Sequence, residues 1–337
     1  MRPMLFSSVV LSFASFLSAT AAAPAPAKPR AILDRIDYSY TNAAASFTGD
    51  SKTLATGGQP YSLKLWDVAS GKMLRDLGQG VNPDAPSIYK LAFAPDGKTL
   101  AISTDDTYEV QLWTVGARKA KFTLQGGEGR FHAVLFSPDG KTLATACHDG
   151  AVRLYDPANG KPLRSLKGHK LWADPMAFSA DGKTLACGSG GGDVHLWNVP
   201  KGTLKGLLPG HLTGYARNEH KQAVDSVALS ADGTTVMVAD RKGLVRVWDI
   251  AGGKGTVSFK GGAMAVLTAD GKHVISNTPW EVLVHRTSDG ECVAEHKYRY
   301  THVEAFVLSP DGKTIASVLN DSRVLLWDVP SLLPKSK

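Results

Sequence analysis

The chain has 337 residues, of which 43% are hydrophobic and 20% are charged, and its formal net charge is +7. This composition is globular, and no apolar run of about 18 residues outside the N-terminal segment could form an internal transmembrane helix. The mildly positive charge permits anionic partners without requiring them.

Three cysteines, Cys147, Cys187 and Cys292, cannot all pair, which argues against a disulfide framework. We expect buried thiols, with one bridge between Cys147 and Cys187 as the alternative.

The first 21 residues have the pattern of a secretory signal peptide. Arg2 precedes an apolar stretch from Met4 to Leu17, and Ala19-Thr20-Ala21 fits a small-x-small cleavage site. An uncleaved anchor is the alternative, but the stretch is short and diluted with serine. We therefore expect export to a periplasmic or extracellular compartment, with no membrane span in the mature chain. The removal of Arg2 would leave 37 basic residues against 31 acidic ones, and residues 22–30, "AAPAPAKPR", read as a stiff Pro/Ala spacer.

A single unit recurs seven times along the remaining chain. Its copies begin at Phe47, Phe93, Phe136, Phe178, Leu229, Leu267 and Leu308. Each contains a turn such as Pro-Asp-Gly between two short apolar runs, which is typical of a hairpin. A second pair of strands follows, as in "VRLYD" at 152–156 and "PLRSL" at 162–166. Four strands in one unit make a sheet too small to bury both faces, so the units must stack on one another.

These units resemble the WD40 repeat of β-propellers. Together with the expected signal peptide, they resemble an exported WD40-repeat protein of bacterial type. The Trp-Asp ending is clear at residues 63–67, 245–249 and 324–328, and weaker at 110–114 and 194–198. The aromatic residues at this place are Trp66, Trp113, Tyr155, Trp197, Trp248 and Trp327, and His285 takes it in the sixth unit. The resemblance implies an all-β fold over residues 31–330, a seven-bladed propeller of four-stranded antiparallel blades, followed by a short tail at 331–337.

The ends of the chain predict how the ring closes. The last unit stops after its third strand, near Val329, and lacks a fourth. Residues 33–36, "LDRI", match the fourth strands at 74–77 and 163–166. The N-terminal strand should therefore pair into the last blade, which leaves only short, protected sheet edges.

The resemblance also implies a hydrogen-bonded set of His, Ser or Thr, Trp and Asp within a blade. The fourth unit retains His169, Ser189 and Trp197, and the third retains Asp149 with Cys147 in the serine place. We interpret these residues as structural. The glycine run at 188–192 is not followed by the Lys-Ser/Thr pair of a phosphate-binding loop.

The residues favour a protein without catalytic activity. None of the ten histidines has the spacing of a metal site, and no nucleophile motif is present, so we expect no catalytic residue, metal or cofactor. The alternatives are an exported propeller enzyme, lactonase-like or quinoprotein-like, with its site at the channel mouth, or a subunit beside a redox protein. We predict a monomeric disc that serves as a scaffold or binding module for protein partners.

Two faces of the disc differ in character. Lysines occupy the first turns of six units and the second turns of five, and these turns should lie at one end of the disc. There the lysines protect the edge or seat an anionic surface or polymer; nucleic acid is unexpected in an exported protein. On the opposite face, Arg130, Trp172 and His302 occupy one matched place, and Tyr215 and Arg217 lie in the long loop at 209–223. Trp and Arg are typical of interface hot spots, although each residue alone also fits ordinary surface or packing. These five residues are the predicted partner-binding face.

Overall fold

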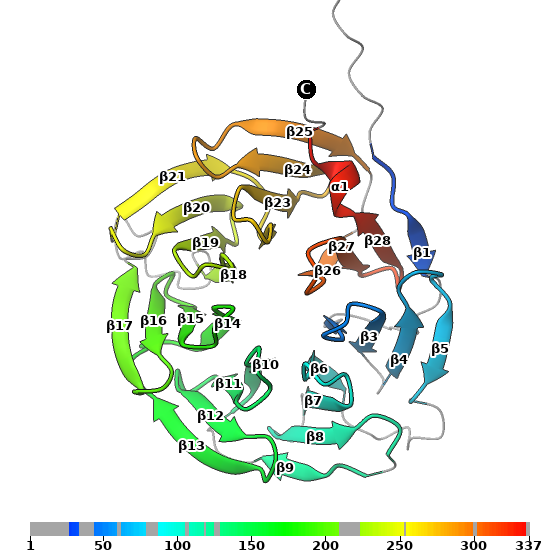
Figure 1. Cartoon of the computed structure of the whole chain (residues 1–337), viewed down its shortest axis with the longest axis vertical. Helices are drawn as coiled ribbons and strands as arrows, with labels where there is room; N and C mark the ends of the chain where they lie inside the picture. Colours follow the sequence, from blue (N-terminus) through cyan, green and yellow to red (C-terminus); the bar gives the residue numbers. More distant parts are fainter. Residues whose placement is uncertain are drawn as a thin grey trace, which may run out of the picture.

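The structure is a computed structural model that describes residues 27–33, 44–58, 62–78, 87–104, 108–117, 119–124, 129–208, 223–252, 254–298 and 302–334. In these residues, seven four-stranded antiparallel sheets surround a central axis (Figure 1). The predicted all-β, seven-bladed propeller is therefore confirmed. None of the helices in the described ranges is long and apolar enough to cross a membrane.

The blades follow one another along the chain, and each strand pairs with the next. Blade 1 comprises β2 (Ala44–Phe47), β3 (Thr53–Gly58), β4 (Ser62–Asp67) and β5 (Met73–Asp76). Blade 2 comprises β6 (Ile88–Phe93), β7 (Thr99–Thr104), β8 (Val110–Thr114) and β9 (Phe122–Leu124). Blade 3 comprises β10 (Phe131–Phe136), β11 (Leu143–Cys147), β12 (Val152–Asp156) and β13 (Lys161–Leu166). Blade 4 comprises β14 (Ala173–Phe178), β15 (Thr184–Ser189), β16 (Val194–Asn198) and β17 (Thr203–Leu208).

The second half of the ring repeats this order. Blade 5 comprises β18 (Val224–Leu229), β19 (Thr235–Asp240), β20 (Leu244–Asp249) and β21 (Lys254–Lys260). Blade 6 comprises β22 (Met264–Leu267), β23 (His273–Asn277), β24 (Glu281–Arg286) and β25 (Cys292–Lys297). Blade 7 comprises β26 (Val303–Leu308), β27 (Thr314–Leu319), β28 (Val324–Asp328) and β1 (Ala31–Leu33), and a short helix, α1 (Val329–Leu332), follows β28.

The N-terminal strand closes the ring, as the sequence predicts. In β1, Ala31 pairs with Leu326 and Leu33 pairs with Val324 of β28, antiparallel. The Arg30 amide donates to the Leu326 carbonyl at 2.6 Å, and the Arg30 side chain donates to the Val68 carbonyl of blade 1 at 3.0 Å. The segment from Arg30 to Leu33 therefore joins the last blade to the first. Ile36, the other residue expected in this strand, lies outside the described residues.

The core lies between blades rather than within them. Seven clusters of buried apolar side chains each combine residues of two adjacent blades, one cluster for each of the seven junctions. The second strands are buried on both faces, as in β11, whereas the fourth strands are largely exposed, as in β13. Since each sheet covers its neighbour, a blade has no complete core of its own.

Repeated turn chemistry sets the first hairpin of each blade. In blade 3, the Ser137 hydroxyl donates to Asp139 at 2.6 Å, and the Lys141 amide donates to the same carboxylate at 3.0 Å. These bonds lower the pKa of Asp139, led by the bond from Ser137. Gly140 adopts φ 70°, a conformation that glycine reaches without steric cost.

The two ends of the disc are distinct. The Val115 amide, at the start of the second turn of blade 2, donates to the Lys98 carbonyl in the first turn at 2.8 Å, and Val199 and Lys183 repeat this bond in blade 4. Both kinds of turn therefore lie at the same end, and Lys98 and Lys183 are exposed there. We call this end the lysine face. The opposite end, with the loops between blades and the turns between second and third strands, is the loop face.

Both ends of the described chain pack against the propeller. Leu332 of α1 is buried in the cluster between blades 6 and 7, and its carbonyl lies 2.9 Å from Nε2 of His296. The Ala27 amide donates to Nδ1 of the same histidine at 3.0 Å. The boundary expected at residue 330 thus falls inside α1, and residues 27–30 of the expected spacer belong to the packed structure. The expected signal peptide, residues 1–21, lies outside the described residues.

Candidate partner-binding site

The matched place of Arg130, Trp172 and His302 has a structural basis. The carbonyl of each accepts a hydrogen bond from the turn between the second and third strands of its own blade. These bonds run from His148 to Arg130 at 2.9 Å, from Gly190 to Trp172 at 3.0 Å and from Asn320 to His302 at 2.9 Å. The three residues therefore stand at equivalent positions of the loop face, in blades 3, 4 and 7.

Trp172 lies at the centre of a group of aromatic rings on this face. The imidazole of His148 stacks on the indole of Trp172 with ring centroids 6.2 Å apart and planes 4° from parallel. His132, on β10, lies 6.5 Å from Trp172 and 5.5 Å from His148, measured between ring centroids. Nε2 of His132 and Nδ1 of His148 are 3.2 Å apart, so the two rings share a hydrogen bond.

Tyr89 of β6 joins Arg130 to this group. The guanidinium carbon of Arg130 lies 5.2 Å from the centroid of the Tyr89 ring, and Nζ of Lys90 lies 5.4 Å from it. The imidazole of His132 meets Tyr89 edge-on at 6.0 Å between centroids. We call Tyr89, Arg130, His132, His148 and Trp172 the aromatic cluster. It extends over blades 2, 3 and 4 and combines stacked rings with a cation.

His132 in this cluster stays neutral down to acidic pH. Burial lowers the pKa of His132 to about 4, and the positive charges of His148, Lys90 and Arg130 add to this shift. A neutral imidazole stacks on tyrosine and tryptophan without competing with the arginine for an anionic partner. His132 therefore adds no positive charge to the cluster near neutral pH, whereas Arg130 supplies one, with Lys90 beside it.

Charged side chains extend the site into the central channel. Lys90, Asp174, Asp225 and Glu304 line a channel cavity of about 450 Å³. Burial raises the pKa of Asp174 to about 6, and the charge of Lys90 acts against this shift. Burial alone would lower the pKa of Lys90, but the surrounding carboxylates, with Asp174 foremost, outweigh it and raise the pKa. The channel mouth thus holds a lysine ammonium group stabilised by acids from other blades.

A separate charged pocket lies on the same face over blades 5 to 7. It has a volume of about 720 Å³, and Asp225, Arg241, His302 and Glu304 are among its lining residues. Arg241 pairs with Asp225 at 3.1 Å, and Nε2 of His302 lies 3.9 Å from the Glu304 carboxylate. Asp225 and Glu304 also line the channel, so the charged pocket adjoins the channel mouth.

The structure describes three of the five predicted partner-binding residues. Arg130 and Trp172 belong to one aromatic cluster, whereas His302 lies in the charged pocket. Tyr215 and Arg217 lie outside the described residues. Sequence reasoning missed Tyr89, His132 and His148. His148 lies in a turn between the second and third strands, and such turns share the loop face with Trp172. That position in the sequence could have identified His148 as a neighbour of Trp172.

Most of the structural repeat residues are buried, although Trp113 is half-buried and Asp149 is exposed, and their partners differ from those expected. Trp66 donates its indole N–H to Thr56 at 2.9 Å, and Trp327 donates to Ser317 at 3.1 Å, so the partner stands ten residues before the tryptophan. By the same count, Cys187 stands at this position in blade 4 instead of the expected Ser189, and the Trp197 indole N–H has no hydrogen-bond partner among the described residues. The hydroxyl of Ser189 instead bonds to Asp193, close to His169. The expected set of His169, Ser189 and Trp197 is not formed.

Other expected roles are clearer in the structure. Asp149 holds its own turn through the Ala151 amide at 2.9 Å and pairs with Arg153. Cys147 and Cys187 are buried, Cys292 is exposed, and none of the three forms a disulfide, so the alternative bridge is absent. Burial raises the pKa of the Cys187 thiol well above its usual range, which makes it a poor nucleophile.

Four segments match the family model for the WD domain, G-beta repeat: residues 118–156, 160–198, 205–249 and 290–328. Each begins near the outer strand of one blade and ends with the third strand of the next. These four segments are therefore similar to WD40 repeats, and each ends where the sequence carries the Trp-Asp ending or a weaker copy of it.

Three similar proteins illustrate how far the likeness extends. An Arabidopsis thaliana protein, "Autophagy-related protein 16", is 25% identical over 297 residues, which cover 84% of this chain and 46% of that protein. "Coronin-7" of Rattus norvegicus is 32% identical over 111 residues, which cover 32% of this chain and 12% of that protein. "Protein tipD" of Dictyostelium discoideum is 26% identical over 121 residues, 36% of this chain and 19% of that protein. The chain spans less than half the length of these relatives, and all three are eukaryotic, so they give no support to a bacterial type.

Proposed function

We propose that this chain, a seven-bladed propeller with segments similar to WD40 repeats, is a non-enzymatic binding module whose protein partner docks on the aromatic cluster. The observation that carries the proposal is the meeting of Arg130 and Trp172 with Tyr89, His132 and His148 on one face. Trp, Tyr and Arg are the residues most enriched at binding hot spots. WD40 propellers also generally bind protein partners.

The chemistry of the cluster suggests what the partner presents. The stacked rings of His148 and Trp172 offer a flat apolar surface, and Arg130 and Lys90 offer cations beside the Tyr89 ring. A partner segment with an apolar or aromatic anchor next to a carboxylate would satisfy both groups. The rigid blades hold these side chains in place, so little conformational entropy is lost on binding.

The test is a comparison of two double variants. Trp172→Ala with Arg130→Ala removes the centre of the aromatic cluster, and Lys141→Ala with Lys183→Ala is the matched control on the lysine face. Partners are captured from a native extract, identified by mass spectrometry, and then measured individually by surface plasmon resonance. Hot-spot residues contribute about 2 kcal/mol or more, so the first double variant should weaken binding by about 30-fold or more.

Circular dichroism must first show that both double variants are folded. The lysine variant should then bind like the wild type. Equal binding by the Trp172 and Arg130 variant, or a loss confined to the lysine variant, would contradict docking on the aromatic cluster and favour an anionic partner on the lysine face.

We also propose that this binding takes place outside the cytoplasm, in a periplasmic or extracellular compartment. The support is the pattern of residues 1–21, with one positive charge, an apolar stretch and a small-x-small site. Cell fractionation and N-terminal sequencing of the native protein would test it. The expected mature chain starts at Ala22 in an exported fraction, and a cytosolic chain that keeps residues 1–21 would refute export.

A further inference from the structure

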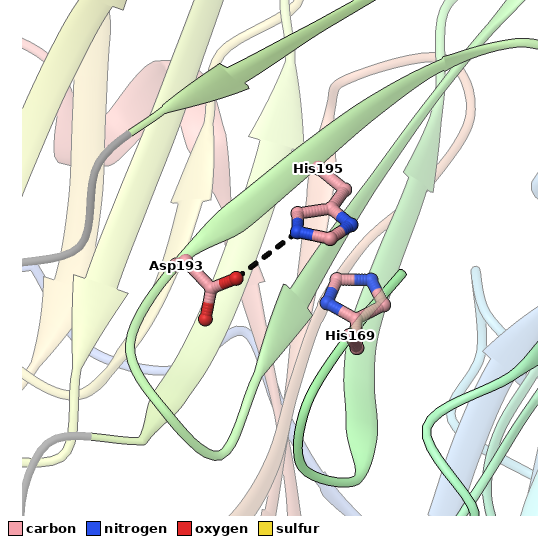
Figure 2. A group of neighbouring side chains, drawn as sticks. All are labelled: His169, Asp193 and His195. Atoms are coloured by element: carbon pink, nitrogen blue, oxygen red, sulfur yellow. Dashed lines mark ion pairs between the residues drawn. The ribbon is translucent and has the colours of Figure 1, made fainter. Parts of the chain in front are cut away.

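Three metal-binding side chains meet in blade 4, at the edge of the loop face (Figure 2). His169 comes from the loop between β13 and β14, Asp193 from the turn before β16, and His195 from β16 itself. Among the residues that the structure describes, they are the one group of three or more histidine, cysteine or acidic side chains whose ligand atoms all lie within 4.8 Å of one another.

The geometry brings one nitrogen of each imidazole toward a single carboxylate. Nε2 of His195 lies 3.0 Å from Oδ2 of Asp193. The rings of His169 and His195 stack with centroids 3.8 Å apart and planes 15° from parallel, and Figure 2 shows a ring nitrogen of each on the side of Asp193. The carboxylate is itself positioned by the Ser189 hydroxyl, which accepts from the Gly191 amide at 3.1 Å.

The hydrogen bonds of these histidines are incomplete. Neither ring nitrogen of His169 has a hydrogen-bond partner among the described residues, and Nδ1 of His195 has none. Both side chains are buried, with His169 8% exposed and His195 5% exposed. Buried polar atoms are normally satisfied because leaving them without a partner is costly, so the unpartnered imidazole of His169, beside His195 and Asp193, calls for a ligand that accepts a lone pair.

We propose that His169, Asp193 and His195 bind a divalent transition metal ion, with zinc as the best match. Two imidazole nitrogens and one carboxylate oxygen are a common zinc donor set, and a water molecule would complete a tetrahedron. The Asp193 side chain is 31% exposed, which leaves a path for the ion and for the fourth ligand. The ion would replace the proton that His195 and Asp193 share.

One of the three side chains must move before the site can hold the ion. Zinc–ligand bonds of about 2.0–2.2 Å place neighbouring ligand atoms about 3.3 Å apart in a tetrahedron. The pair from His195 and Asp193, at 3.0 Å, is already close to this separation. Because a bound ion lies in the plane of each imidazole, His169 must rotate out of the stack while its nitrogen approaches.

Metal binding would fix the loop that carries Trp172. His169 precedes Trp172 by three residues, and the Trp172 indole occupies the space that a side chain on Gly190 would fill. An ion held by His169, Asp193 and His195 would therefore join this loop to the turn beneath the aromatic cluster. The binding of the ion itself does not depend on the partner proposed above.

The test is isothermal titration of the full purified protein with Zn²⁺ alone, after removal of metal with a chelator. We expect about one ion per chain, and at least tenfold weaker binding in His169→Gln and in His195→Gln. Co²⁺ should give visible absorption bands of a low-symmetry site in the wild type and lose them in both variants. The matched control is His148→Gln, because the imidazoles of His132 and His148 also lie together, with ring nitrogens 3.2 Å apart.

Circular dichroism shows whether each variant is folded. If one of the two histidine variants at the site does not fold, Asp193→Asn replaces it in the titration. The proposal is overturned if the wild type binds no zinc, or if His169→Gln binds it as tightly as the wild type. It is also overturned if only His148→Gln loses binding, since the ion would then sit in the aromatic cluster.

Discussion

Leu33 is the side chain through which β1 closes the ring, and its truncation should destabilise the whole propeller. It is 1% exposed and packs in the cluster between blades 7 and 1, together with Phe47, Leu54 and Trp66. Its neighbour Ile32, in the same strand, is 46% exposed. The pair therefore offers a buried position and an exposed one at the same place in the fold.

The expected magnitudes follow from burial. A fully buried Leu→Ala change costs about 2–5 kcal/mol, because the apolar transfer energy is lost and a cavity remains. Ile32→Ala should cost less than about 1 kcal/mol, since nearly half of that side chain is already in water. For a protein of this size, each kcal/mol lowers the melting temperature by about 1–2 °C, so Leu33→Ala should melt a few degrees below Ile32→Ala.

The assay is urea unfolding of both variants, followed by circular dichroism and by tryptophan fluorescence. Trp66 lies in the same cluster as Leu33, so part of the tryptophan emission reports on the closure. Leu33→Met, which conserves volume, should recover most of the lost stability. Equal unfolding midpoints for Leu33→Ala and Ile32→Ala would refute the reasoning, because β1 would then add no more than an exposed strand does.

Three further outcomes are expected. The folded-state pKa of His132 is about 4, below the usual histidine pKa of 6.5. This group therefore favours the folded state above pH 6.5, and that contribution to stability is lost as the pH falls toward 4. The melting temperature of His132→Gln should fall less steeply with acid than that of the wild type. Ser317→Ala removes the acceptor of the Trp327 indole N–H in a buried site and should cost about 1–3 kcal/mol in urea unfolding, whereas Ser331→Ala on the surface should cost little. A thiol reagent should modify only Cys292 in the native protein and all three cysteines after unfolding; rapid reaction at the other two would contradict their burial.

The sequence by itself determined the blade and its number. The Asp-Gly turns and the flanking apolar runs are local signals, because glycine at positive φ and an aspartate that caps its own turn act within a few residues. Seven copies of such a hairpin predict seven blades, and the match of Leu33 to other fourth strands predicts the closure. Each of these inferences needs only the order of residues within one unit.

Only the tertiary structure decided which side chains meet between units. Tyr89, Arg130 and Trp172 come from three different blades, and no spacing along the chain places them together. The same is true of His169 and His195, which have no metal-ligand spacing but stack because a loop between blades folds over the next sheet. The physical reason is that strand pairing is set by local hydrogen bonds, whereas the contacts that form a site depend on how whole blades pack around the ring.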